Sequence, residues 1–412
     1  MDFDFSWLLL GFPIAFVLGW LASRFDLRQL KLENRQAPKA YFRGLNFLLN
    51  EQQDQAIDAF IEAVQNDPDT QELHFALGNL FRRRGEYQRA VRVHEHLLGR
   101  GDLSRADRER AQHALAQDFL RAGLLDRAEA ALQKLEGTRY ENEARLSLLA
   151  IYERSREWTQ AAAVAEKLDA AGQASHSTRR SHYLCEQAAE RLAKGDDTAA
   201  AAELLRQAVA LAPTAPRPAI DTAALQWRMG QPDAAFDTLM ALSERAPLAL
   251  PLCAGTLQQA AVAAGRTGEA LALLERRYAE QPSIDLLEAI IALGGLPVRA
   301  DGGTPVFEPA SPPAPETGVD AAPQQVGTTP RDGYIAHLTR QPSLVAASRW
   351  LAGETFANEQ FHPQVQRALE QATRPLMRYR CAACGFEAHQ YFWHCPGCQA
   401  WDSYPPRRVE EL

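Results

Sequence analysis

The sequence predicts a mostly α-helical protein built from repeated helix pairs, with a small metal-binding domain near its carboxyl end. Three observations lead to this fold class. Alanine, leucine, arginine, glutamine and glutamate, which favour helices, crowd nearly every window up to about residue 290. A period near 34 residues runs through the same region. Four of the six cysteines fall within the 18 residues from 381 to 398.

Charge and composition narrow the functional classes. The 412 residues carry 44 Lys plus Arg against 52 Asp plus Glu, a formal net charge of −8. Because nucleic-acid binders normally present a basic surface, this balance argues against a nucleic-acid partner. At 46% hydrophobic and 23% charged residues, the chain can bury a sizeable core. We therefore expect a globular protein of two or three units that binds no nucleic acid.

An uncharged stretch lies near the start of the chain, at residues 5–22. As a helix rising about 1.5 Å per residue, its 18 residues span roughly 27 Å, just enough to cross the hydrocarbon core of a bilayer. Trp7 and Trp20 near its ends suit the membrane interface. A cleaved signal peptide is the alternative, but it needs a positive start, where this chain has two aspartates. We predict an uncleaved transmembrane anchor over residues 1–24.

The charges around this stretch predict its orientation. No basic residue precedes it, whereas five follow it closely, and the positive-inside rule then leaves the amino terminus outside and the body in the cytoplasm. A reducing compartment also suits clustered cysteines that bind metal instead of forming disulfides. The five residues are Arg24, Arg28, Lys31, Arg35 and Lys39.

The 34-residue period matches the tetratricopeptide repeat, in which small residues recur where the paired helices approach closely. One repeat begins at Ala37 and the next at Gln71, one period later, which places Gly44 and Gly78 at the same small position. Because one helix pair cannot bury its apolar face alone, stacked repeats form a superhelix with a concave groove. We predict about seven repeats over residues 37–296. The later ones begin, with small slips, at Glu109, Asn142, His182, Pro216 and Pro251.

The composition changes after the repeats. Residues 297–330 hold eight prolines, which predicts a flexible linker. Residues 331–376 return to short helical runs, and we interpret them as degenerate closing helices that dock the last domain onto the solenoid. Residues 377–412 form that domain.

The four clustered cysteines have the spacing C-x2-C-x10-C-x2-C, typical of a metal-binding ribbon with two knuckles. We expect Gly385 and Gly397 to supply the positive φ of the knuckle turns. Four thiolates favour one tetrahedral ion, either zinc or iron as in rubredoxin, and they leave no open position for catalysis. The predicted ligands are Cys381, Cys384, Cys395 and Cys398.

Other features of this domain and the remaining cysteines are predicted to be structural. We expect a short strand at residues 391–393 and a domain too small to fold without its metal. His389 and His394 are interpreted as surface or supporting residues, because four thiols already complete the site. Cys185 and Cys253 lie in helical stretches and are expected to be buried apolar residues.

The sequence contains no phosphate-binding glycine loop, no zinc-protease motif and no nucleophile elbow, so we predict a protein that is not an enzyme. His94 and His96 suggest a metal site, but residues two apart do not share a helix face, and His94 occupies a packing position of its repeat. Both are predicted to be structural.

A partner-binding groove is the weaker prediction. Several positions on the first helix of each repeat usually line the concave face, where Asn, Gln and Arg side chains would suit an extended or acidic partner segment. Ordinary surface polarity is the alternative. The predicted groove residues are Asn79, Arg82, Arg83, Arg110, His113, Gln117 and Arg121.

Three stretches together with the anchor resemble the lipopolysaccharide assembly protein B family over nearly the whole chain. They are residues 41–49 (YFRGLNFLL), 77–85 (LGNLFRRRG) and 378–401 (RYRCAACGFEAHQYFWHCPGCQAW). The resemblance implies an inner-membrane anchor with a periplasmic amino terminus, cytoplasmic repeats, and a rubredoxin-like domain packed on them and held by the four cysteines. The proline-rich residues 297–330 depart from the family's more continuous helical body.

The resemblance further implies an adaptor function. It implies that the protein promotes degradation of the lipid A pathway deacetylase by the membrane-bound AAA+ protease and so limits lipopolysaccharide synthesis. Other lipopolysaccharide assembly proteins are then further partners, and a homo-oligomer is compatible with the role. Two alternatives stay open: a general scaffold for envelope assembly, and a rubredoxin-type electron carrier.

Overall fold

The computed structural model describes residues 15–20, 39–40, 42–66, 70–172, 175–195, 198–294, 330–354 and 359–412. The chain divides into two compact units, Met1–Arg156 and Glu157–Leu412. Within the described ranges, no helix is long and apolar enough to cross a membrane. The predicted anchor lies outside these ranges, apart from helical residues 15–20.

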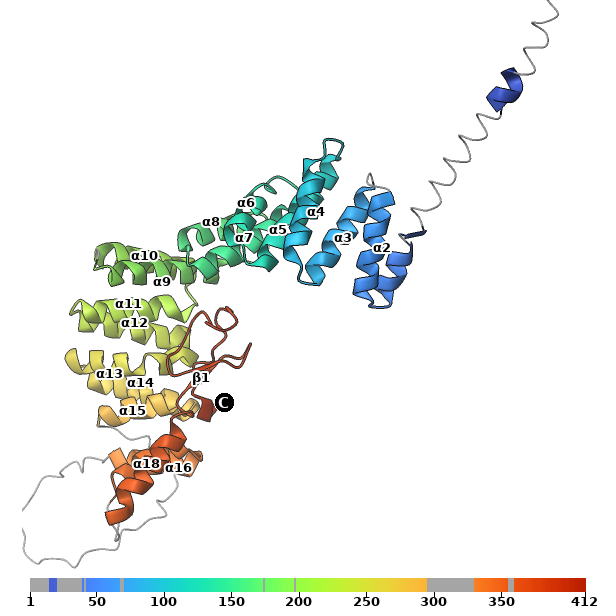
Figure 1. The fold of residues 1–412 in the computed structure, drawn as a ribbon. Coiled ribbons are helices and arrows are strands. Elements are labelled where there is room, and N and C mark those ends of the chain that lie inside the picture. The colour runs from blue at the N-terminus through green and yellow to red at the C-terminus, as the bar shows by residue number, and fades with distance from the viewer. Residues whose placement is uncertain are drawn as a thin grey trace, which may run out of the picture. The chain divides into compact units, whose positions relative to one another are not determined.

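The first unit is a row of helices, each packed on the next (Figure 1). Helix boundaries follow local chemistry, since Ser104 caps the start of α5 by accepting a hydrogen bond from the Asp107 amide at 3.1 Å. Gly123 ends the same helix with a φ of 74°. After helical residues 42–49 come α2 (Gln53–Asn66), α3 (Gln71–Arg83), α4 (Tyr87–Gly99), α5 (Arg105–Ala122), α6 (Leu125–Gln133) and α7 (Glu141–Ser155).

The small residues of the repeat pattern allow the helices of this unit to approach. A Cβ atom on Gly44 would lie 3.0 Å from the Phe60 ring, and one on Gly78 would lie 2.5 Å from Nε2 of His94. His94 is fully buried. The pattern therefore arises because a large side chain of the second helix fills the space above a glycine of the first.

The second unit is itself a stack of helices in the part of the chain that is described (Figure 1). Its largest core joins alanines and leucines of α11 to α15, with Phe236 and Tyr278 among the fully buried side chains. The elements are α8 (Trp158–Ala170), α9 (Ser177–Ala193), α10 (Thr198–Leu211), α11 (Pro216–Arg228), α12 (Pro232–Arg245), η1 (Pro247–Leu252), α13 (Ala254–Ala263), α14 (Thr267–Glu280) and α15 (Ile284–Ala292).

Further helices follow the predicted linker, which lies outside the described residues except for Pro330, the first residue of α16. Val345 and Ala346 of α17 belong to the same core as α11 to α15. The Tyr278 hydroxyl lies 2.5 Å from Nδ1 of His337, a buried contact between α14 and α16. These helices are α16 (Pro330–Arg340), α17 (Leu344–Ala352), η2 (Glu359–Phe361) and α18 (His362–Thr373).

The last domain contains two short antiparallel strands, β1 (Tyr379–Arg380) and β2 (Glu387–Ala388), and ends with η3 (Val409–Glu411). The prediction of a strand at residues 391–393 is wrong, because none of the three residues belongs to a strand. These side chains make ring contacts instead, and the Tyr391 hydroxyl donates to the Tyr404 carbonyl at 2.9 Å. The predicted class, a mostly helical tetratricopeptide-like solenoid with a metal ribbon, is confirmed.

Candidate metal centre and repeat groove

Two equivalent turns present the four cysteines. In the first turn the Gly385 amide donates to the Cys381 carbonyl at 2.9 Å, and the Cys381 amide donates to the Phe386 carbonyl at 2.9 Å. In the second turn the Gln399 amide donates to the Cys395 carbonyl at 2.8 Å, and the Cys395 amide donates to the Ala400 carbonyl at 2.9 Å. The repeated C-x2-C spacing therefore folds into the same knuckle twice.

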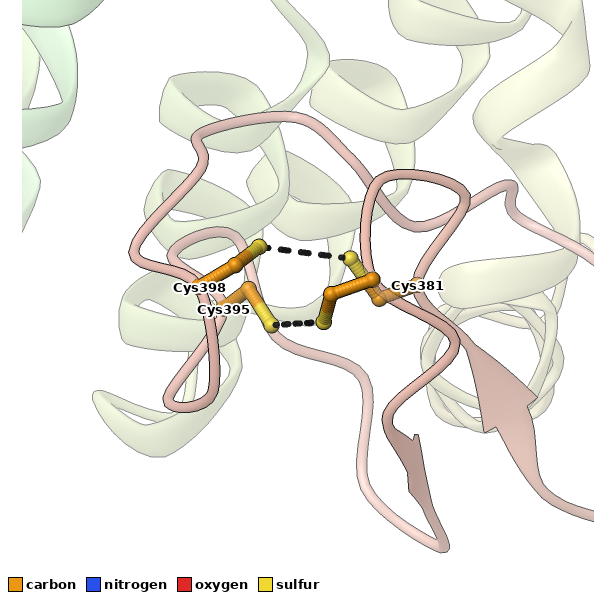
Figure 2. Close-up of side chains that lie close together, drawn as sticks. Cys381, Cys395 and Cys398 are labelled. Atoms are coloured by element: carbon orange, nitrogen blue, oxygen red, sulfur yellow. Dashed lines mark hydrogen bonds between the residues drawn. The ribbon is translucent and has the colours of Figure 1, made fainter. Parts of the chain in front are cut away.

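The knuckles place the four sulfurs around one point (Figure 2). The Sγ atoms of Cys381 and Cys398 are 3.8 Å apart, those of Cys384 and Cys395 are 3.7 Å apart, and all four lie within 4.8 Å of one another. With metal–sulfur bonds of about 2.3 Å, a regular tetrahedron separates its sulfurs by about 3.8 Å. The predicted cluster is thus confirmed as a site that can hold one metal ion.

The surroundings of the sulfurs favour thiolates at two positions. Burial would raise the pKa of Cys381, but the Ser403 hydroxyl and the Cys384 and Ala383 amides outweigh it and lower that pKa to about 6. The pKa of Cys395 is lowered in the same way, against burial, by the amides of its own knuckle and by the Tyr404 hydroxyl. Because thiolates are the form that binds metal, these hydrogen bonds favour that form at Cys381 and Cys395. At Cys384 the Phe386 amide lowers the pKa, but burial and the three neighbouring sulfurs outweigh it and raise that pKa to about 12.

The backbone of the knuckles confirms one predicted glycine and corrects the other. Gly385 has a φ of 78°, as expected for the residue that closes the first turn. The matching position of the second turn is Gln399, with a φ of 61°, so the prediction of positive φ at Gly397 is wrong. A Cβ atom on Gly397 would instead lie 3.4 Å from the Phe386 ring and 3.5 Å from the Cys384 sulfur, so this glycine allows the two knuckles to lie close together.

An aromatic stack docks the metal domain on α9. The Trp401 ring lies between the rings of His182 and His394, at centroid distances of 4.8 and 4.3 Å. Trp158 of α8 and Tyr183 of α9 contact Trp401 edge-on, at 6.2 and 5.8 Å. Since aromatic contacts of this kind add about 0.5–1.5 kcal/mol each beyond burial, the stack fixes the domain firmly against the helices.

Polar contacts complete this docking surface. Nε2 of the buried His182 lies 2.9 Å from the Asp402 carboxylate, and the Trp158 indole donates to Glu190 at 3.0 Å. The guanidinium of Arg217 on α11 lies 6.0 Å from the centre of the Trp393 ring. The sequence predictions missed His182, Asp402 and Trp158 as docking residues; the available signal was an aromatic cluster beside the second knuckle.

The last residues of the metal domain hold the last helices together. Glu410 accepts from the Leu344 and Val345 amides at 2.6 and 3.1 Å, where α17 begins. Glu411 accepts from the Ile284 amide at 2.6 Å, where α15 begins. Two adjacent glutamates therefore cap two helices that are far apart in sequence, which satisfies amides that a helix leaves free.

The predicted groove residues lie on two neighbouring helices, α3 and α5. Arg82 donates to Oδ1 of Asp118 at 3.0 Å, to the Ala114 carbonyl at 3.1 Å and to Asn79 at 2.6 Å. Oδ2 of the same buried Asp118 lies 2.5 Å from Nδ1 of His94. Asn79 and Arg82 therefore take part in a network that links α3, α4 and α5.

Some of the other groove residues make side-chain contacts within the first unit, and others are exposed. Arg110 donates twice to Glu72 and lies 4.0 Å from the centre of the Phe75 ring. The His113 ring stacks on the Tyr140 ring with 4.5 Å between their centres. Nε2 of Gln117 lies 3.4 Å from Nε2 of His113. Arg83 and Arg121 are exposed at the ends of their helices. These two arginines are the groove residues most accessible to a partner.

The remaining histidines and cysteines agree with structural roles. His96 stacks on His74 at 5.6 Å. Cys185 and Cys253 are buried, and burial raises the pKa of Cys253 to about 12. A thiol held in this state is a poor nucleophile and a poor metal ligand.

A helical solenoid that carries a closed four-cysteine ribbon defines a tetratricopeptide-repeat protein with a rubredoxin-like metal centre. A family described as rubredoxin metal binding domain matches residues 379–405, and one described as tetratricopeptide repeat matches residues 73–109. Lipopolysaccharide assembly protein B of Escherichia coli K12 is 31% identical over 411 residues, covering 97% of this chain and 98% of the relative. Its counterpart in Haemophilus influenzae is 27% identical, covering 98% of each chain. The chain belongs to the lipopolysaccharide assembly protein B family.

Proposed function

We propose that this protein is a non-enzymatic adaptor for lipopolysaccharide assembly. In this role it brings the lipid A pathway deacetylase to the membrane-bound AAA+ protease, so that the deacetylase is degraded and lipopolysaccharide synthesis is limited. Membership of the family supports the assembly role. One observation carries the adaptor role: the metal site has no open position for a substrate, whereas the repeat helices leave arginine side chains accessible to a partner.

The metal site supports a structural role. Its four thiol ligands complete a tetrahedron, so the ion would have no open position for a substrate. The domain around it is docked through Trp401 and Asp402 on helices of the second unit. A metal used in this way stabilises a binding scaffold, because the free energy of metal binding becomes free energy of folding.

The first unit supports partner binding. Its helices α3 and α5 carry the exposed Arg83 and Arg121 beside a network that fixes the neighbouring side chains. Repeat solenoids bind extended segments along such helices, and arginine suits acidic side chains. We infer that the deacetylase or the protease contacts this surface.

The proposed location is the inner membrane. The stretch at residues 5–22 anchors the protein with its amino terminus in the periplasm and its body in the cytoplasm. Restriction to the membrane raises the effective concentration of the adaptor near a membrane-bound protease.

Depletion of the protein tests this proposal. After new synthesis is blocked, the deacetylase half-life should lengthen in depleted cells, and lipopolysaccharide should accumulate. An unchanged half-life would reject the proteolytic role. If crosslinking from membranes then captured many envelope proteins, the general scaffold would be the better account.

A further inference from the structure

Three arginines occupy the same place in successive repeats of the first unit. Counted from the repeat starts given above, the thirteenth residue is Arg83 on α3, Arg121 on α5 and Arg154 on α7. All three side chains are exposed, and none of them makes a hydrogen bond or an ion pair with the described residues. Two of them belong to the predicted groove, whereas the sequence predictions did not include Arg154. We call these three residues the arginine row.

The helix dipole does not explain the arginine row by itself. A basic side chain near the C-terminus stabilises any helix, so the dipole alone would favour arginine equally on both helices of a pair. Among the numbered helices of the first unit, α3, α5 and α7 have arginine in the last turn. The second helices of the pairs do not, since α2 and α6 have no basic residue there and α4 has only His96. The row therefore follows one kind of helix, as a binding surface along the repeats would.

The positive charges of the arginine row are not neutralised by the carboxylates close to it in sequence. Glu86, in the turn after α3, pairs with Arg84 and Arg89 at 2.9 and 2.8 Å. Glu153, next to Arg154, is buried. The row therefore presents accessible positive charge that an acidic partner can pair with.

Two amide side chains lie beside the row and favour a peptide as the occupant. Asn79 and Gln117 precede Arg83 and Arg121 by four residues, which places each pair on one helix face. Both amides are partly exposed, and Nδ2 of Asn79 and Oε1 of Gln117 have no hydrogen-bond partner among the described residues. A free donor and a free acceptor suit the C=O and N–H groups of a peptide backbone, whereas a lipid phosphate can only accept. On α7 the same face carries Leu146, which is 47% exposed and suits an apolar side chain.

The spacing of the helices limits the conformation of such a peptide. Helices α3 and α5 are in contact through Arg82 and Asp118, and α5 and α7 through His113 and Glu143. Neighbouring helices have about 8–10 Å between their axes. A polyproline II segment has three residues per turn and rises about 3.1 Å per residue, so every third side chain points the same way at intervals of about 9.3 Å. In a β-strand, side chains three apart point to opposite sides.

We propose that the arginine row binds an acidic peptide segment in the polyproline II conformation, with a carboxylate at every third residue. Each carboxylate pairs with one arginine, and the backbone between them pairs with the amides of Asn79 and Gln117. This inference rests on the proposed adaptor function and deepens it, because it specifies the chemistry of the partner segment that the first unit holds.

The test uses the purified full-length protein in detergent and three labelled peptides, with binding measured by fluorescence anisotropy. The spaced peptide is acetyl-Glu-Pro-Leu-Glu-Pro-Leu-Glu-amide, the clustered peptide is acetyl-Leu-Pro-Glu-Glu-Glu-Pro-Leu-amide, and the neutral peptide has glutamine for each glutamate of the spaced one. The spaced peptide should bind about tenfold more tightly than the neutral peptide, because three exposed ion pairs contribute about twofold each or more. The clustered peptide should bind between the two, since it cannot reach all three arginines. Arg154→Gln should weaken binding of the spaced peptide about twofold to fivefold.

Arg92→Gln is the matched control, because Arg92 is an exposed arginine of α4 that forms no ion pair with the described residues and lies outside the row. It removes the same charge and should bind all three peptides as the unmodified protein does. Equal affinity for the spaced and clustered peptides, or equal loss in Arg92→Gln and Arg154→Gln, would overturn the proposal in favour of general charge attraction. Absence of binding would also overturn it. Displacement of the spaced peptide by an equal concentration of glycerol phosphate would show a site for lipid headgroups instead.

This assay contains neither the deacetylase nor the protease, so its failure can be told apart from failure of the proposed function. Loss of the spacing preference would reject the arginine row while leaving the half-life measurement in cells as it stands. An unchanged half-life together with preferred binding of the spaced peptide would reject the proteolytic role alone.

Discussion

Gly78 and His94 depend on each other in the second repeat. Gly78→Ala would place a Cβ atom 2.5 Å from the His94 ring, and His94 cannot move freely because it contacts Asp118. Overpacking costs about 1–3 kcal/mol, which exceeds the gain in helix propensity of about 1 kcal/mol. We therefore expect a lower free energy of unfolding in urea. Gly99→Ala, a glycine of α4 with open space around it, should be neutral or slightly stabilising. Equal effects of the two substitutions would show that the contact is unimportant.

Replacing the sulfur of Cys395 by oxygen tests the metal centre. Cys395→Ser removes a thiolate from a site whose metal contributes to folding, so we expect loss of bound metal and rapid proteolysis of residues 377–412. Metal content by mass spectrometry and limited proteolysis measure the two effects. Cys253→Ala, at a buried cysteine outside the cluster, should keep one ion per chain. Full metal content in Cys395→Ser would refute the ligand assignment, and a coloured, oxidisable centre would favour the electron-carrier alternative.

The residues of the metal centre were predictable in part. The spacing of four cysteines identifies the ligands, because a knuckle turn needs C-x2-C whatever surrounds it. The spacing does not say which turn residue adopts positive φ, and Gln399 takes that position where Gly397 was expected. The pairing of His182 with Asp402 joins residues 220 positions apart, and no local pattern predicts such a contact.

Helix α5 provides a prediction of pH dependence at the scale of one element. Burial lowers the pKa of His113 below 6.5, against the opposing effect of Glu143. A histidine with a depressed folded-state pKa contributes stability above its unfolded pKa, and this is lost as pH falls. The free energy of unfolding should therefore decrease as the pH falls from about 7.5 to about 5. His113→Phe, which keeps a ring against Tyr140, should make this decrease with pH smaller. Identical slopes would contradict the assignment.

The groove prediction belongs to α3 and α5 together. Arg83→Glu combined with Arg121→Glu should weaken capture of the partner in a membrane pull-down, while the free energy of unfolding changes by only about 0.5 kcal/mol, because both side chains are exposed. The matched control is Arg92→Glu with Arg105→Glu, which makes the same charge change at exposed positions outside the groove. Unchanged capture in the first variant would move the binding surface elsewhere.

Elements were predictable where the period was strong. Gln71 and Pro216, predicted repeat starts, begin α3 and α11, whereas α5 begins four residues before the predicted Glu109. Small slips of this kind arise because loop lengths vary without changing the packed faces. The caps made by Glu410 and Glu411 could not be predicted, since a glutamate becomes a cap only when the fold brings a helix end to it.

For the whole molecule, the anchor and the body should be separable. Removing residues 1–22 leaves the repeats and the metal domain intact, so we expect the shortened protein to fold and to bind its partners in solution. It should nevertheless fail to shorten the deacetylase half-life, because tethering no longer concentrates it beside a membrane-bound protease. An unrelated transmembrane helix with the same charge asymmetry should restore turnover, since the membrane requires only length, apolarity and flanking charge. Full turnover without any anchor would refute the tethering argument, and failure of the substituted helix would show that residues 1–22 make specific contacts of their own.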